Sequence, residues 1–178
     1  MLGSVYAHIF GAANARRDVY ELSRRVYEHE DPEFDVDEWV AGAHPLDDHA
    51  LEHPLVTELV GQDETGPSAA LAYMEDMDED DAGAVIRWMM AGAFKGLFET
   101  DAEFCEDRFA SAIADHMELW VTSEESGFPL GVDWAEAIDW EYIAGDAVGV
   151  PEQRFYSIEA DEGVYVFDVK ISIGQYRE

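Results

Sequence analysis

The net charge of this chain constrains its fold more than any other feature of the sequence. Its 178 residues include 41 aspartates and glutamates but only 10 lysines and arginines, a formal net charge of −31. Self-repulsion at this level opposes a compact state, and solubility alone needs far less charge. Hydrophobic residues nevertheless make up 48% of the chain and aromatic residues 12%. A chain with this much apolar surface to bury is expected to fold rather than stay disordered.

The acidic residues are spread evenly along the chain. Residues 1–89 carry 21 acidic and 5 basic side chains, and residues 90–178 carry 20 and 5. This distribution argues against a detachable acidic tail, which would load one end. It also argues against direct binding to nucleic acid or to an anionic membrane, because both surfaces would be repelled. The expected partner is therefore a basic protein surface.

Cysteine usage and hydropathy indicate the compartment. Cys105 is the single cysteine, so neither a disulfide framework nor a thiolate metal cluster is expected within one chain. No apolar run approaches the length of a membrane span, and the N-terminal residues lack the basic region of a signal peptide. We expect a cytoplasmic protein.

The apolar pattern predicts an α+β fold that ends in a β-hairpin. In the N-terminal third we expect a short strand, then a helix that begins at Asn14 and ends at Pro32, then an extended segment from Glu28 to Glu38 in which acidic and apolar residues alternate. The expected strand is Val5–Phe10. Further helices are predicted at Ser68–Met74, Ala84–Met90, 102–117 (capped by Asp101) and Trp134–Gly145. The predicted hairpin pairs Phe155–Ala160 with Val164–Ile173 through a three-residue turn, with Gly163 in the left-handed position.

These elements predict an elongated chain of small helix-plus-sheet modules. The modules are expected at 1–67 (N-terminal, α+β), 68–120 (central, mainly helical) and 121–178 (C-terminal, α+β). The large aromatic side chains must supply much of the core of so charged a chain. We therefore expect burial of Trp39, Phe104, Trp134 and Trp140.

No motif predicts catalysis, a metal site or a cofactor, so the chain is not expected to be an enzyme. The run from Asp76 to Asp80 resembles the start of a calcium loop, but Asp81 and Arg87 stand where that loop needs glycine and glutamate. His49 and His53 have the spacing of a helical metal pair without a convincing third ligand, and surface histidines are the favoured interpretation. Cys105 lies on an apolar stripe, which favours a core residue.

Four segments in order resemble the ArdA family of antirestriction proteins. They are Glu30-Asp31-Pro32-Glu33-Phe34 with Asp37 and Trp39, Ala93-Phe94-Lys95-Gly96-Leu97-Phe98 with Ala102-Glu103-Phe104, Ile138-Asp139-Trp140-Glu141-Tyr142-Ile143-Ala144-Gly145-Asp146, and the hairpin sequences Phe155-Tyr156-Ser157-Ile158 and Val164-Tyr165-Val166-Phe167. The resemblance implies a curved three-module protein, often dimeric. Such a protein imitates bent B-DNA and occupies the DNA groove of a type I restriction–modification enzyme. A CRISPR or other nuclease complex is an alternative target.

Mimicry of DNA would give the acidic side chains a collective function. Duplex DNA carries about one charge per 1.7 Å, so a charge of −31 corresponds to roughly 53 Å of duplex. Such density favours an elongated or dimeric molecule, and a homodimer is an expected partner state. The carboxylates expected to stand in for phosphates are Glu28, Glu30, Asp31, Glu33, Asp35, Asp37, Glu38, Glu75, Asp76, Asp78, Glu79, Asp80, Asp81, Glu103, Glu106, Asp107, Glu136, Asp139 and Glu141.

Two other classes of protein remain open at this point. A halophilic protein would be acidic as an adaptation to salt, and the scarcity of lysine (Lys95 and Lys170 only, against eight arginines) fits that class. An acidic enzyme subunit or a chaperone-like partner of a basic protein is the third class, which no motif favours.

Overall fold

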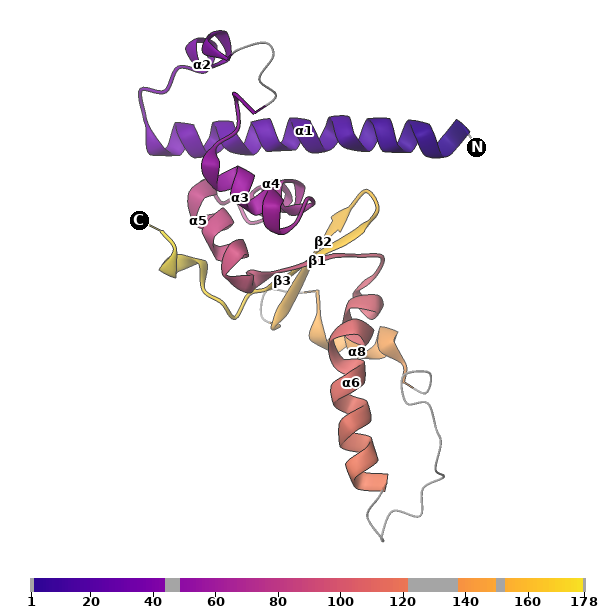
Figure 1. The fold of residues 1–178 in the computed structure, drawn as a ribbon. Coiled ribbons are helices and arrows are strands. Elements are labelled where there is room, and N and C mark those ends of the chain that lie inside the picture. The colour runs from indigo at the N-terminus through magenta and orange to yellow at the C-terminus, as the bar shows by residue number, and fades with distance from the viewer. Residues whose placement is uncertain (1, 44–48, 122–137, 150–152, 178) are drawn as a thin grey trace. The chain divides into compact units, whose positions relative to one another are not determined.

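The chain has the mixed α+β fold that the sequence predicts, with a hairpin near its C-terminus (Figure 1). The computed structural model describes residues 2–43, 49–121, 138–149 and 153–177. The chain divides into two compact units. Unit 1 comprises Met1–Gly96 with Ile171–Glu178, and unit 2 comprises Leu97–Lys170. The division into three modules stays a prediction.

Unit 1 is built on one long helix. Helix α1 packs against α3, α4 and α5. The helices of this unit are α1 (Leu2–Glu30), α2 (Val36–Gly42), α3 (Pro54–Gln62), α4 (Gly66–Asp76) and α5 (Ala82–Trp88), with a π turn η1 (Met89–Ala93) and a 3-10 turn η2 (Ile173–Gln175). The largest buried side chain between them is Trp88, whose indole Nε1 donates to the carbonyl of Ile171. This bond ties the C-terminal residues of the chain to unit 1.

The expected strand at Val5–Phe10 is wrong, because α1 runs through it without a break. The residues from Gly11 to Ala15 contain three alanines and no proline. Alanine is the strongest helix former, so nothing in this stretch stops a helix that has already formed on either side. The predicted start at Asn14 is wrong for the same reason.

The extended conformation expected from Glu28 to Glu38 is also wrong. Helix α1 continues to Glu30, and α2 begins at Val36 after a short turn. Asp35 is the N-cap of α2, since its Oδ1 accepts hydrogen bonds from the backbone N–H groups of Asp37 and Glu38. The alternation of acidic and apolar residues thus marks a helix start and not a strand.

Among its described residues, unit 2 contains the hairpin and two helices. Its elements are α6 (Asp101–Val121), α8 (Trp140–Ala147), β2 (Phe155–Ala160) and β3 (Gly163–Asp168). Strand β1 (Phe94–Phe98), whose last two residues belong to this unit, completes a sheet of order β1-β3-β2. The predicted hairpin is confirmed, with Phe155 paired to Asp168 and Ala160 to Gly163. Its second strand is shorter than the predicted Val164–Ile173, because it ends at Asp168.

The hairpin turn is shorter than predicted. Only Asp161 and Glu162 lie between the paired residues Ala160 and Gly163. Gly163 has a positive φ of 149°, and a Cβ added there would lie 2.0 Å from the carbonyl oxygen of Phe98. Glycine is therefore favoured both by this backbone conformation and by the close approach of the β1 backbone.

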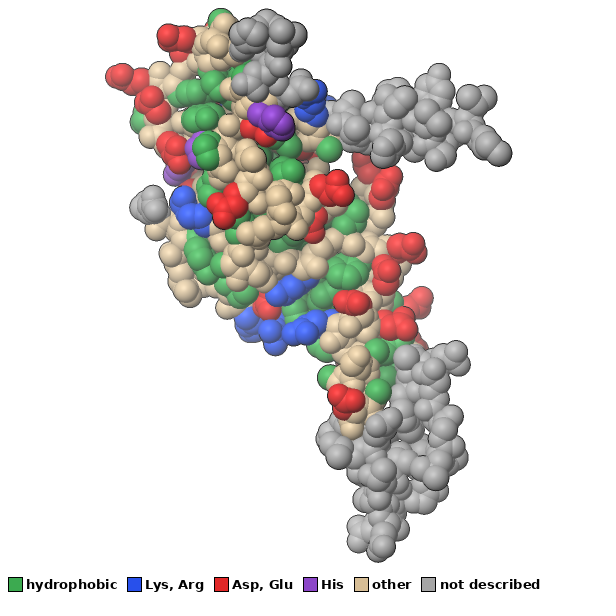
Figure 2. All heavy atoms as spheres, viewed as in Figure 1, with side chains coloured by type: hydrophobic (Ala, Val, Ile, Leu, Met, Phe, Trp, Pro, Cys, Tyr) green, Lys and Arg blue, Asp and Glu red, His purple; other side chains and the backbone are tan. Residues whose placement is uncertain are grey.

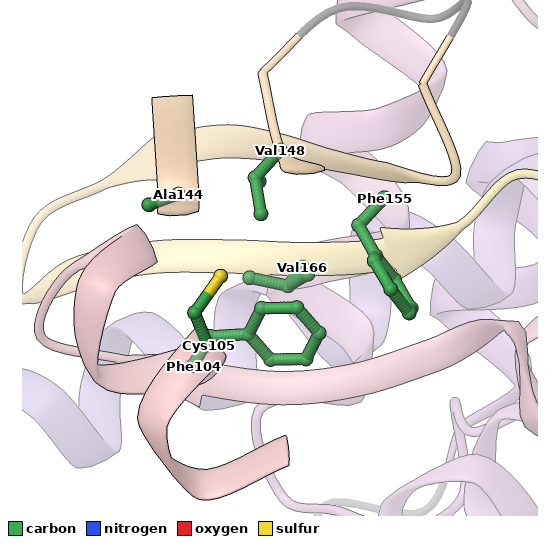
Figure 3. Packing of buried hydrophobic residues seen from close by; sticks show 6 residues of the cluster. All are labelled: Phe104, Cys105, Ala144, Val148, Phe155 and Val166. Atoms are coloured by element: carbon green, nitrogen blue, oxygen red, sulfur yellow. The ribbon is translucent and has the colours of Figure 1, made fainter. Parts of the chain in front are cut away.

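The core of unit 2 lies between α6, α8 and the hairpin (Figure 3). Phe104 is central, with ring centroids 4.9 Å from Phe155 and 5.2 Å from Phe98. The prediction that Phe104 is buried is confirmed at 1% exposure. Trp140 is only half-buried against this cluster. Trp39, which belongs to unit 1, is also only half-buried. Trp134 lies outside the described residues.

Both helices of unit 2 begin differently from the prediction. Helix α6 is capped by Thr100, whose hydroxyl accepts from the backbone N–H of Glu103 at 3.1 Å, and not by Asp101. Helix α8 begins at Trp140 after its N-cap Asp139. The predicted helix placed Asp139 in its middle, and its residues 134–137 lie outside the described part of the chain.

Candidate functional site

The carboxylates that the sequence singles out lie almost entirely on the surface. Sixteen of the predicted nineteen are exposed: Glu28, Glu30, Asp31, Glu33, Asp35, Asp37, Glu38, Glu75, Asp76, Asp78, Asp80, Glu103, Glu106, Asp107, Asp139 and Glu141. Glu79 is half-buried, Asp81 is buried, and Glu136 lies outside the described residues. Acidic side chains are visible on both units in the face that Figure 2 shows. The carboxylates fall into clusters, and each cluster has its own local support.

The acidic segment 28–38 is held by an aromatic cluster in unit 1. The ring of Tyr27 stacks on that of Phe34, with centroids 5.4 Å apart and planes 14° apart. Trp39 completes the cluster, 5.7 Å from Tyr27 and 5.6 Å from Phe34. His53, at the start of α3, meets Tyr27 edge-on at 4.6 Å. Such aromatic pairs contribute beyond the area they bury, so they fix the backbone that carries the acids.

Two acids of this segment also hold its turns. Asp31 Oδ1 accepts from the backbone N–H of Glu33 at 2.9 Å. Asp35 Oδ1 accepts from Asp37 at 2.9 Å and from Glu38 at 3.1 Å. Aspartate favours such turns because its carboxylate reaches backbone groups two or three residues on. The segment therefore has defined positions for its carboxylates.

A hollow of about 500 Å³ lies beside the segment. Carboxylates of Asp31, Glu33 and Glu38 line it together with the rings of Phe34 and Trp39. A hollow lined by both carboxylates and aromatic residues suits a cationic side chain with an apolar stem, which can form an ion pair and a cation–π contact together. The segment has seven acids and no lysine or arginine.

The second acidic cluster of unit 1 is the segment 75–81 between α4 and α5. The buried Asp81 (7% exposed) is the N-cap of α5, since its Oδ1 accepts from the backbone N–H of Ala84 at 2.8 Å. Its Oδ2 lies 3.6 Å from Nε2 of His29. Glu79 forms an ion pair with Arg177. These two carboxylates are engaged within unit 1, whereas Glu75, Asp76, Asp78 and Asp80 are exposed.

The described unit 2 acids among those predicted to stand in for phosphates lie at or near the starts of its helices. Glu103, Glu106 and Asp107 are exposed on α6, where the spacing of three and four residues places them on one face. Glu103 also accepts from the backbone N–H of Glu99 at 2.6 Å. Asp139 accepts from the backbone N–H of Tyr142 at 3.0 Å. Acidic groups at helix N-termini are stabilised by the helix dipole.

The described histidines His49 and His53 contact different partners. Nδ1 of His49 lies 2.9 Å from Oε1 of Glu52. His53 is the N-cap of α3, and its Nδ1 accepts from the backbone N–H of Leu55 at 3.1 Å. Nε2 of His53 lies 3.3 Å from Glu30. His44 is outside the described residues, among which no group of three or more potential ligands could hold a metal ion. The capping role of His53 was missed by the sequence analysis, although Pro54 directly after it signals the first turn of a helix.

Cys105 is a core residue, as predicted. Its side chain is fully buried in the unit 2 cluster. Burial raises the pKa of its thiol from the usual 9.0 to about 11, and the nearby Asp101 carboxylate adds to this rise. A thiol with a raised pKa and no access to solvent is a poor nucleophile.

The stability of the fold should therefore fall as pH rises from about 9 toward about 11. The thiol of the unfolded chain loses its proton near the lower value, whereas the folded thiol keeps its proton until the higher one, so the unfolded state is favoured in between. Urea unfolding at both ends of this range measures the effect. Tyr73, whose pKa burial also raises, contributes in the same direction at high pH.

The matched variant is Cys105→Ala. It should lose less stability across this range than the natural chain does. An equal loss in both proteins would contradict the assignment of the effect to Cys105.

Comparisons with models of protein families, with curated proteins and with solved structures give no match for the chain. Among the described helices, none is both long enough and apolar enough to cross a membrane. Function therefore has to be inferred from the placement of the carboxylates.

Proposed function

We propose that this protein is a DNA mimic that occupies the DNA-binding surface of a host defence enzyme, a type I restriction–modification complex. The observation that carries the proposal is the acidic segment 28–38. The backbone that carries its exposed carboxylates is held by the cluster of Tyr27, Phe34 and Trp39, and the carboxylates of Asp31 and Asp35 are held by backbone hydrogen bonds.

Fixed carboxylates matter because binding removes conformational freedom. A side chain that is already ordered loses less on binding, so a preorganised acidic surface binds more tightly than a mobile one of equal charge. A surface that serves only solubility or salt tolerance has no such need. The hollow beside Phe34 and Trp39 supports the same proposal, because DNA-binding surfaces present arginine and lysine side chains.

Among DNA-binding defence enzymes, the resemblance to ArdA proteins favours a type I restriction–modification complex as the target. The acidic segment 28–38 contains the first of its four matching motifs. The protein acts in the cytoplasm, where such complexes meet DNA, and inhibits by occupation without catalysis. A CRISPR or other nuclease complex has the same basic chemistry and is the alternative target.

Competition for a purified type I restriction–modification complex tests the proposal. A fluorescent DNA duplex that carries the recognition site is bound first, and the protein is then titrated in. We expect full displacement of the duplex, because both ligands need the same basic surface. Simultaneous binding of protein and duplex would contradict mimicry, and absence of binding would exclude this enzyme as the target.

Adaptation to high salt is the second candidate, favoured by two lysines against eight arginines. This candidate predicts that the fold is lost at low ionic strength, because a salt-adapted protein needs salt to stabilise its fold. Circular dichroism in dilute buffer distinguishes the two candidates. A mimic whose acidic loops are held by aromatic contacts should stay folded there.

A further inference from the structure

One tyrosine on α8 of unit 2 is unusually exposed. Tyr142 is 72% exposed, more than any other large hydrophobic side chain in the described part of the chain. The two that come next are Val40 at 52% and Met77 at 39%. Tyr142 contributes little to the stability of the fold, because its ring stays in water.

The residues that anchor α8 place Tyr142 on the far side of that helix. Four of its residues pack in the core cluster of unit 2, namely Trp140, Ile143, Ala144 and Ala147. Figure 3 shows Ala144 within that cluster. Tyr142 is two residues from both Trp140 and Ala144, which places it about 160° around the helix axis from each. Its ring therefore points away from the core.

Carboxylates flank Tyr142 on this outer side of α8. Asp139 comes three residues before it and Asp146 four residues after it, the spacings of neighbours on a helix surface. Glu141 directly precedes it, and all three carboxylates are exposed. Asp139 is also fixed, since its Oδ1 accepts from the backbone N–H of Tyr142 at 3.0 Å.

The surface beside Tyr142 is open. Gly145 follows it by three residues, and a Cβ added there would meet nothing within 4 Å. The sequence has no lysine or arginine between Arg108 and Arg154, so α8 has no strong cation of its own. We name Asp139, Glu141, Tyr142, Gly145 and Asp146 the α8 outer face.

An aromatic ring flanked by carboxylates has the chemistry to bind arginine. The planar guanidinium group can stack on an aromatic ring while its N–H groups pair with a carboxylate. The ammonium group of lysine is compact and more strongly hydrated, so it gains less from the ring. Tyrosine and arginine are also enriched among the few residues that dominate the binding energy of protein interfaces.

We propose that the α8 outer face binds an arginine side chain of the basic partner, with the guanidinium group between the ring of Tyr142 and the carboxylate of Asp146. This proposal rests on the proposed function, since the partner is the same basic surface. It adds a contact in unit 2 that depends on a ring as well as on charge. The ring gives this contact a preference for arginine over lysine.

Oligoarginine and oligolysine peptides of equal length test this chemistry without the target enzyme. NMR of the isotope-labelled full chain follows the backbone N–H signals of α8 at about 0.15 M salt, where charges are screened beyond about 8 Å. The natural chain should bind the arginine peptide more tightly at these signals. Tyr142→Ser should raise the dissociation constant of the arginine peptide there about threefold to tenfold, and that of the lysine peptide less than about twofold.

Three further variants separate the ring from the charge. Tyr142→Phe keeps the ring and should keep the preference for arginine. Tyr142→Leu keeps an apolar side chain without ring faces and should behave like Tyr142→Ser, which makes it a second test if the serine variant does not fold. Asp146→Asn removes a charge beside the ring, so it should weaken both peptides by a similar factor.

Val40→Ser is the matched control, because it removes an exposed apolar side chain from unit 1. It should leave the response of the α8 signals unchanged. Two results would overturn the proposal. One is a natural chain whose α8 signals show no preference for arginine, and the other is a preference that survives the loss of the ring.

Competition for the type I restriction–modification complex separates this proposal from the proposed function. If the natural chain displaces the duplex, Tyr142→Ser should do so about tenfold to a hundredfold less well, the usual loss at a residue that dominates an interface. Equal displacement by both would overturn the α8 contact and leave the proposed function standing. A natural chain that prefers the arginine peptide at α8 but does not displace the duplex would contradict the proposed function and leave the arginine site standing.

Discussion

Replacing Trp88 with alanine should lower the free energy of unfolding by about 3–5 kcal/mol, the usual cost of removing a buried large aromatic side chain. Trp88 is 1% exposed and its ring lies 4.6 Å from that of Tyr73. Its indole N–H donates to the carbonyl of Ile171, so the change also leaves a backbone acceptor without its partner. Urea unfolding followed by circular dichroism measures the loss.

Trp140→Ala provides the comparison in unit 2. Trp140 is half-buried against the cluster around Phe104, so its removal exposes less apolar surface. Trp140→Ala should therefore lower the free energy of unfolding by no more than about half as much as Trp88→Ala. Equal losses at the two positions would contradict the burial that the structure assigns to them. A loss below about 1 kcal/mol at Trp88 would contradict its place in the core.

Local patterns predicted the C-terminal hairpin and the core position of α6. The hairpin follows from alternating side chains on either side of a turn, which are close in the sequence. The apolar stripe of α6 predicted the burial of Cys105, although the helix runs from Asp101 to Val121 and is longer than the predicted 102–117. The local pattern could not show which distant residue packs against the turn. Gly163 is needed because the carbonyl of Phe98 approaches it, and that residue is 65 positions away.

The main errors in unit 1 concern where helices begin and end. Asp35 and Asp81 were assigned to acidic runs, whereas each is the N-cap of the helix that follows. An aspartate before an apolar stretch is a recognised start signal, but one cap is hard to single out among the seven acids of segment 28–38 or the six acids of segment 75–81. The alternation around Phe34 suggested an extended segment, because a strand and the first turn of a short helix both place apolar residues close together in the sequence.

Contacts between distant parts of the chain were beyond sequence reasoning. Arg87 donates to the carbonyl of Tyr176 and Arg177 pairs with Glu79, each across more than eighty residues. The aromatic cluster likewise brings His53 onto Tyr27. For the candidate site, the sequence pattern predicted acids that are mostly exposed but missed the burial of Asp81, and the local support of these acids follows only from the folded chain.

Reversing three charges of the acidic segment 28–38 should weaken binding to a type I restriction–modification complex by about 30- to 1,000-fold. The variant is Glu33→Lys, Asp37→Lys and Glu38→Lys, which leaves the N-cap Asp35 and the turn residue Asp31 in place. Like charges brought together at an interface cost several kcal/mol in total, and each 1.4 kcal/mol is tenfold in affinity. Competition with labelled duplex measures the change.

The control must reverse as many charges elsewhere, and Glu58, Glu64 and Glu162 are exposed acids outside every cluster. If the carboxylates of segment 28–38 stand in for phosphates at fixed positions, changing these three to lysine should weaken binding far less. Equal losses would mean that affinity follows net charge alone, and the segment would have no special part in binding. Affinity should also fall as salt rises, because screening shortens the reach of exposed charges. A rise in affinity with salt would instead mean that salt stabilises the fold itself, as adaptation to a saline cytoplasm predicts.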